Sequence, residues 1–232
     1  MQLLPITLGI ARERASNPQT SSPGTLSGVS LELKQKILER DNHTCRFCGF
    51  ESHKYQDVQA VDGNPANTHV DNLVTTCIFC QQCFDLEKSS EMRSGVLVWL
   101  PEIAQADLHH VTRAIYVARI SQGPMAEAAK NAYKILMERR EEAKVRLGTD
   151  DPYILSTVMR DFIGPRHYAM RGQKLDGVRL FPLDRRIIKE GDLEFNQFPQ
   201  ILAYWRSKDG PFGAKAPHQW KMFYARVTQL AA

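Results

Sequence analysis

CRFC at residues 45–48 and CIFC at residues 77–80 are two Cys-X-X-Cys motifs, and 28 residues separate them. Each motif lets two sulfurs converge on one ion, and four thiolates suit the tetrahedral geometry and soft-ligand preference of zinc. We therefore predict one structural Zn²⁺ per chain, bound by Cys45, Cys48, Cys77 and Cys80. Four reduced cysteines without a metal, or a redox-active pair, are weaker alternatives because two motifs at this spacing fit one shared ion better.

A fifth cysteine and three histidines lie close to these motifs. Cys83 follows Cys80 by three residues. A closed four-coordinate site has no place for a fifth ligand, so we predict a buried thiol on a helix face. His43, His53 and His69 could compete as metal ligands, but we expect them in loops or at the surface.

The composition is that of a globular protein. The 232 residues are 43% hydrophobic and 24% charged, which excludes collagen-like, coiled-coil and disordered classes. Residues 1–14, MQLLPITLGIARER, carry no basic residue before their short apolar stretch, unlike an export signal. No apolar run reaches the roughly 18 residues of a membrane span. We expect a cytoplasmic protein without a disulfide framework.

Charge is divided unevenly along the chain. Residues 1–100 carry 9 Lys/Arg and 11 Asp/Glu, a net charge of −2, whereas residues 101–232 carry 21 and 15, a net charge of +6. A nucleic-acid-binding module would be expected to make the cysteine-bearing part basic. The charge distribution therefore argues against nucleic acid as a partner.

The segments around the two motifs predict short elements. Residues 15–30 are rich in Ser, Pro, Gly and Thr and predict a surface linker. Ser30 can cap a helix that carries Leu33, Ile37 and Leu38 and ends at residues 40–42. The pattern then predicts a strand at 55–61, a turn at 62–65, a segment at 72–77 that leads into the second motif, a short helix through Lys88 and a strand at 95–100.

The second half of the chain is predicted to be mainly helical. Residues 164–217 contain 6 Gly and 5 Pro among 54 positions, so we expect only short elements there, such as one at 200–206. The predicted helices are one with Leu108, Val111, Ile115 and Ala118 on one face, a second at 125–147 stopped by Gly148, a third that begins at Asp151-Pro152 and carries Ile154, Leu155, Val158, Met159 and Phe162, and a last amphipathic stretch at 219–230.

These patterns predict an α+β protein. We divide it into an N-terminal segment and linker (1–30), a small ββα-like zinc module (31–94) and a mostly helical extension packed on that module (95–232). Trp99, Trp205 and Trp220 should anchor the core, although Trp205 could instead contact a partner helix. Residues 160–189 hold 8 Lys/Arg against three Asp. They predict either a docking surface for an acidic or amphipathic peptide or an ordinary basic loop region.

Three stretches resemble a zinc-supported HNH endonuclease module: residues 40–49 (RDNHTCRFCG), 58–64 (VQAVDGN) and 71–81 (DNLVTTCIFCQ). In that family a strand ends in a His pair or Asp-His, and another His follows the second Cys-X-X-Cys motif. These histidines supply the general base and the ligands of the catalytic divalent ion.

This chain departs from the HNH pattern at the positions of the catalytic histidines. Gln59 and Ala60 occupy the strand-end positions, and Gln81 follows the second motif. Loss of a water-activating imidazole alone costs about 10² to 10⁴ in rate. We therefore expect a module that is not an enzyme.

The degenerate module is followed by GVLVWLPE at 95–102 and a long extension that includes LDGVRLFPLDRR at 175–186. This combination is similar to the IcmJ/DotN proteins of Dot/Icm type IVB secretion systems. The resemblance implies a structural zinc and a cytoplasmic subunit of the type IV coupling complex. It further implies binding to the C-terminal tail of the coupling ATPase (DotL) and to other coupling-complex subunits, with only indirect association with the inner membrane.

Two other functions remain open from the sequence. A nuclease with relocated ligands could use His53 or His69. A non-catalytic DNA-binding module could use the basic C-terminal region, and its affinity would then fall steeply with salt.

Overall fold

The structure is a computed structural model that describes residues 2–11, 29–64, 66–220 and 222. It mixes helices with small antiparallel sheets, so the predicted α+β class is confirmed. Most of the predicted linker at 15–30 and of the predicted amphipathic stretch at 219–230 lies outside the described residues.

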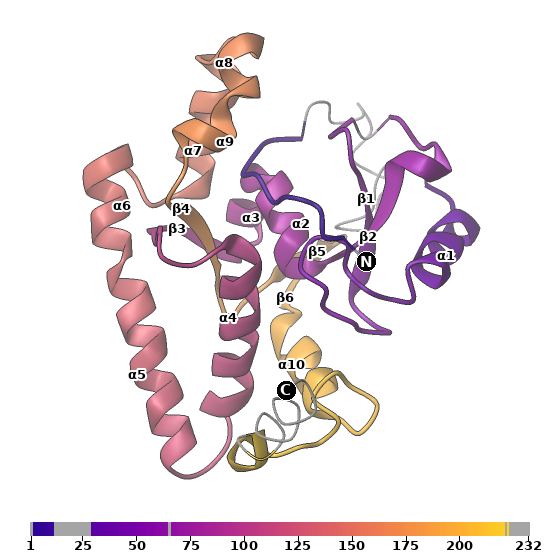
Figure 1. Ribbon diagram of the computed structural model, residues 1–232, viewed down its shortest axis with the longest axis vertical. Helices are drawn as coiled ribbons and strands as arrows, with labels where there is room; N and C mark the ends of the chain where they lie inside the picture. Colours follow the sequence, from indigo (N-terminus) through magenta and orange to yellow (C-terminus); the bar gives the residue numbers. More distant parts are fainter. Residues whose placement is uncertain (1, 12–28, 65, 221, 223–232) are drawn as a thin grey trace.

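The two Cys-X-X-Cys motifs belong to a small unit that extends from the centre to the right of Figure 1. The predicted cap of α1 (Leu31–Arg40) is confirmed, because the Ser30 side chain accepts a hydrogen bond from the Leu33 N–H. After α1 comes the first motif, then β1 (Gln56–Ala60), η1 (Val70–Asn72) and β2 (Leu73–Cys77). β1 and β2 pair antiparallel, with Gln56 opposite Cys77 and Ala60 opposite Leu73.

Two helices follow β2, where the sequence predicted one. α2 (Ile78–Phe84) begins directly after the strand, and α3 (Leu86–Glu91) begins after Asp85. The Asp85 carboxylate accepts a hydrogen bond from the Lys88 N–H, which caps α3 and interrupts the helix.

A second antiparallel sheet joins distant parts of the chain. β3 (Gly95–Trp99) was predicted, but its partner β4 (Val178–Pro182) lies in the Gly- and Pro-rich region and was not. Gly177 precedes β4 with φ +86°, and a Cβ there would lie 2.5 Å from the Trp99 ring. Only glycine fits this close approach of backbone to indole.

Long helices cover the other side of the molecule, where α4 (Gln105–Arg119) lies beside α5 (Pro124–Glu138) in Figure 1. The prediction of one helix at 125–147 is wrong, because α6 (Arg140–Leu147) is a separate helix. The chain breaks at Arg139, whose guanidinium donates to the Trp99 carbonyl and whose own carbonyl accepts from the Trp99 N–H. Docking of the β3 end therefore interrupts the helix. Gly148 ends α6 in the left-handed conformation, as predicted.

The remaining elements are short. α7 begins at Pro152 behind the Asp151 cap, as the sequence predicted. In chain order they are α7 (Pro152–Asp161), α8 (Pro165–Ala169), α9 (Arg171–Lys174), the antiparallel pair β5 (Ile187–Glu190) and β6 (Leu193–Asn196), α10 (Phe198–Arg206) and η2 (Pro217–Gln219).

Some apolar residues of the predicted helices face solvent. On α4, Val111 is 40% exposed, on α7 Ile154 and Val158 are 49% and 40% exposed, and Phe162 directly after α7 is 79% exposed. These residues therefore do not belong to the core. On α4 the reason is that the buried side includes the polar residues His109, Thr112 and Arg113. Apolar periodicity alone does not identify such a side.

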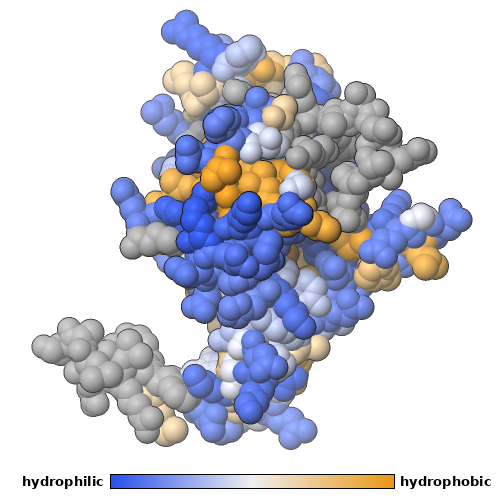
Figure 2. Space-filling model, turned by 90° about the vertical axis from the view of Figure 1, so that its right-hand side faces the viewer, coloured by the Kyte–Doolittle hydropathy of each residue, from blue (hydrophilic) through white to orange (hydrophobic). Residues whose placement is uncertain are grey.

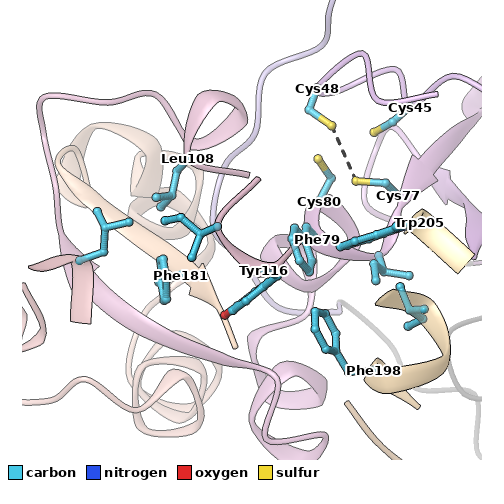
Figure 3. Packing of buried hydrophobic residues seen from close by; sticks show 14 of the residues in the cluster. Cys45, Cys48, Cys77, Phe79, Cys80, Leu108, Tyr116, Phe181, Phe198 and Trp205 are labelled. Carbon is cyan, nitrogen blue, oxygen red and sulfur yellow. Dashed lines mark hydrogen bonds between the residues drawn. The ribbon is translucent and has the colours of Figure 1, made fainter. Parts of the chain in front are cut away.

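One large core cluster joins residues on both sides of the predicted boundary at 94/95. It contains Phe79 from α2, Leu108 and Tyr116 from α4, Phe181 from β4 and Trp205 from α10 (Figure 3). Trp205 is 1% exposed, as expected of a core anchor. The cysteines lie at one end of this core.

The outer surface is mixed. Figure 2 shows a mainly hydrophilic face with a hydrophobic patch in its upper half. Within the described part of the chain, no helix has the length and apolar character needed to cross a bilayer.

Candidate metal centre

The first motif is held in a tight turn between α1 and β1. The Cys45 N–H donates to the Phe50 carbonyl, and the Gly49 N–H donates back to the Cys45 carbonyl. Gly49 adopts φ +73°, which allows the chain to reverse. The turn directs Cys45 and Cys48 to the same side.

The second motif spans a strand end and a helix start. Cys77 is the last residue of β2, and Cys80 lies in the first turn of α2. The hairpin register therefore fixes one sulfur, and the first helical turn brings the other back beside it.

The four sulfurs converge, as Figure 3 shows. Cys45, Cys48, Cys77 and Cys80 are buried, with all four Sγ atoms within 4.8 Å of one another. The Sγ atoms of Cys48 and Cys77 are 3.7 Å apart. Tetrahedral Zn–S bonds of about 2.3 Å place sulfurs about 3.8 Å apart. The cluster therefore has the dimensions of a metal site.

A buried cation faces the cluster. Arg113 of α4 is 1% exposed, and its Nη2 lies 2.8 Å from Cys77 Sγ and 3.8 Å from Cys48 Sγ. Its Nε and Nη1 have no hydrogen-bond partner, and no ion pair to a carboxylate is found for it among the described residues. A buried charge without a counter-charge costs several kcal/mol. The guanidinium therefore fits a cluster of negatively charged sulfurs.

The sulfur nearest Arg113 is the one most readily ionised. Burial disfavours a thiolate at Cys77, but hydrogen bonds from Cys45, Cys48 and Cys80 and the positive charge of Arg113 lower the pKa of Cys77 well below its usual value. Metal ligation requires thiolates, and Cys77 is the sulfur best placed to supply one.

His109 lies on the other side of the cluster. Its Nδ1 is 3.3 Å from Cys80 Sγ, and its Nε2 is 2.8 Å from the Gln105 amide nitrogen. Burial lowers the pKa of His109 to about 3, so the ring is neutral. The imidazole can therefore donate one hydrogen bond and accept one.

The remaining candidates do not belong to the cluster, although Cys83 Sγ lies 3.8 Å from His109 Nε2. Cys83 is fully buried, and burial raises the pKa of its thiol, as expected of an unligated cysteine on a helix face. His53 and His69 are exposed, and His43 is partly buried with its ring centre 4.5 Å from that of His53. In the parts of the chain that the structure describes, the four cysteines form the one His/Cys/Asp/Glu group close enough to hold a metal.

The three positions that depart from the HNH pattern lie on β1 and α2. Ala60 is buried, and the Gln59 amide donates to its carbonyl at 3.3 Å. The Gln81 amide donates to the Asp57 carboxylate at 3.4 Å. These side chains supply no imidazole.

The comparisons with known proteins identify the family. No protein-family model matches the chain. It is similar to the type 4 apparatus protein DotN of Legionella pneumophila subsp. pneumophila (strain Philadelphia 1), with 35% identity over 161 residues, which cover 68% of this chain and 75% of DotN. The chain belongs to the DotN family. Membership confirms the IcmJ/DotN family recognised from the sequence, whereas the HNH likeness remains a prediction.

Three residues around the cysteines of this DotN family member were missed in the sequence. Gln105, His109 and Arg113 are spaced four apart on α4, on the buried side that also carries Leu108 and Thr112. The feature of the sequence that could have identified them is three polar residues, spaced four apart, beside the apolar residues of the predicted helix that carries Leu108. Such a row implies buried polar groups that need partners.

Proposed function

We propose that this protein is a non-catalytic adaptor subunit of the type IV coupling complex of a Dot/Icm type IVB secretion system. The observation that carries the proposal is its similarity to the type 4 apparatus protein DotN over 161 residues. Gln59, Ala60 and Gln81, where HNH nucleases have histidines, support a role without catalysis.

We propose that Cys45, Cys48, Cys77 and Cys80 bind one structural zinc ion. The all-sulfur donor set and the spacing of the sulfurs support zinc, which prefers tetrahedral thiolate sites. The ion would cross-link the turn of the first Cys-X-X-Cys motif to the junction between β2 and α2. The protein's own residues hold the ligands in place through the β1–β2 register and the packing of α2.

The partners proposed are the C-terminal tail of the coupling ATPase (DotL) and other coupling-complex subunits. Such a partner would place the protein in the cytoplasm, at the inner membrane only through the complex. An exposed apolar ridge on α7 supports a peptide-binding role. Ile154 and Val158 lie four residues apart on one face of α7, and Phe162, the C-cap residue, continues this spacing with its N–H donating to the Val158 carbonyl.

Charge around this ridge indicates what kind of peptide fits. Residues 152–174 carry four Lys/Arg, Arg160, Arg166, Arg171 and Lys174, and one acid, Asp161. On the inner face of α7, Leu155 and Met159 are buried, and Arg160 reaches Glu87 of α3 at 2.7 Å. The helix is thus anchored, with its apolar ridge outward beside excess positive charge. An amphipathic helix with an acidic flank would complement this surface.

We expect the double variant Val158→Asp, Phe162→Asp to bind a purified coupling-ATPase tail at least about 30-fold more weakly, as loss of about 2 kcal/mol at an interface hot spot would give. Isothermal titration calorimetry on the full chain measures this, together with zinc content, which should not change. Ile135→Asp is the matched control, because Ile135 is 61% exposed on α5.

Two results would count against the partner proposal in different ways. Absence of tail binding by the zinc-loaded wild-type chain would overturn it altogether. Normal binding by the α7 variant with loss in the Ile135 variant would retain the partner but move the binding surface from α7 to α5.

A further inference from the structure

One helix outside the cysteine motifs contacts both of them. His109, His110 and Arg113 of α4 each reach toward a different cysteine. A His110 ring nitrogen lies 2.7 Å from the Cys48 carbonyl, His109 Nδ1 lies 3.3 Å from Cys80 Sγ, and Arg113 Nη2 lies 2.8 Å from Cys77 Sγ. The cysteine cluster is therefore covered by residues from the helical part of the protein.

The hydrogen bonds of Gln105 fix the His109 ring. The Gln105 Oε1 atom accepts from the Leu180 N–H at 2.9 Å, and its amide nitrogen donates to the Leu180 carbonyl at 2.8 Å. This pairing with β4 sets the orientation of the amide. The same amide nitrogen must then donate to His109 Nε2, which therefore carries no proton, so the ring proton is on Nδ1. Nδ1–H consequently donates to Cys80 Sγ.

Arg113 is held at the cluster by aromatic rings from separate elements. Its Cζ lies 3.9 Å from the centre of the Phe50 ring, 5.0 Å from that of Phe79 and 6.0 Å from that of Trp205. A guanidinium stacks favourably on such rings. The rings exclude water from the cation and leave its Nη2 directed at the sulfurs.

We propose that Gln105, His109 and Arg113 form an outer shell that completes the metal centre, so that metal binding and docking of α4 on the cysteine motifs stabilise each other. The inference rests on the zinc proposed above. Zn²⁺ with four thiolates carries a net charge of −2, and burying that charge is costly. Arg113 offsets part of the charge, and the two N–H···S hydrogen bonds orient Cys77 and Cys80. Partners of this kind typically affect metal affinity by about 10- to 100-fold.

The first test is the rate at which zinc leaves the full chain in excess chelator, followed with a chromogenic zinc indicator. We expect Arg113→Met to release zinc about 10-fold faster or more, and Arg113→Lys, which keeps the charge, to fall between it and the wild type. Arg119→Met is the control, since Arg119 lies on the same helix but stacks on Tyr133. Release from both Arg113 variants at the control rate would overturn the proposal.

A second test addresses the hydrogen bond and does not depend on folding of an Arg113 variant. His109→Leu removes the N–H donor and leaves an apolar side chain in a buried position. In the cobalt-substituted full chain, the sulfur-to-cobalt charge-transfer bands should shift to lower energy, because an electron-rich sulfur is easier to oxidise. Bands identical to those of the wild type would overturn the role of His109.

The outcomes separate this inference from the proposed function. A native wild-type chain without bound metal would defeat the zinc proposal itself. A wild-type chain that holds zinc, with variants that release it at the wild-type rate and show unchanged cobalt spectra, would defeat the outer shell alone.

Discussion

Cys77→Ser is expected to abolish zinc binding and to unfold the region around β1, β2 and α2. Cys77 Sγ lies 3.7 Å from Cys48 Sγ and 2.8 Å from Nη2 of the Arg113 guanidinium. A structural zinc site contributes an apparent 10 to 16 kcal/mol of binding free energy at neutral pH, and this energy is linked to folding. Removal of one thiolate would also leave Arg113 buried beside fewer negative charges.

The measurements are zinc content by mass spectrometry and thermal unfolding by circular dichroism. Cys83→Ser is the matched control, because Cys83 is as buried as Cys77 but does not belong to the cluster. The control should retain about one zinc per chain. A Cys77→Ser chain that keeps a full equivalent of zinc and the wild-type melting temperature would show that Cys77 is not a ligand.

Trp205→Ala is expected to lower the free energy of unfolding by about 3 to 5 kcal/mol, as large-to-small changes of buried aromatic residues do. Trp205 is 1% exposed, and its ring meets those of Phe79, Phe50 and Phe198 edge-on at centroid distances of 5.6, 5.8 and 6.0 Å. The indole from α10 thus fills the space next to the second cysteine motif, and alanine would leave a cavity there.

Urea denaturation of the zinc-loaded chain measures this loss. Trp220→Ala is the comparison, because Trp220 is only partly buried, against Phe212. We expect a much smaller effect there. A loss of less than about 1 kcal/mol at Trp205 would contradict the packing of α10 on the cysteine motifs, since full burial of a large side chain is worth more than that.

The sequence predicts the local elements well where the signal is local. Ser30 and the spacing of Leu33, Ile37 and Leu38 specify α1, and Gly148 marks the end of α6. Each Cys-X-X-Cys motif pairs its own two sulfurs locally, through a turn at Cys45–Cys48 and through the first turn of α2 at Cys77–Cys80. These features depend on neighbours within a few residues, and such neighbours are visible in the sequence.

The sequence does not predict features that depend on distant partners. The break at Arg139 arises from hydrogen bonds to Trp99, and β4 forms because β3 is available to pair with it. Arg113 gives no sign in the sequence of the sulfurs and rings that it meets in the fold. Where a tertiary contact determines the secondary structure, it overrides the local propensity of the residues.

The division of the chain at residue 94 remains a prediction. The core cluster runs across this position, from Phe79 through Leu108 to Trp205. If the outer shell acts as proposed, the segment 31–94 and the helical part stabilise each other through the metal centre. Hydrogen exchange in α4 of the full chain should then increase when zinc is removed.

The most direct test of the central claim, that four cysteines hold one structural zinc, is X-ray absorption at the zinc edge of the native full-length protein purified without added metal. We predict about one zinc per chain with four sulfur neighbours at about 2.3 Å. A folded protein that contains no zinc, or a zinc ion bound by nitrogen or oxygen in place of one or more of these sulfurs, would contradict the account.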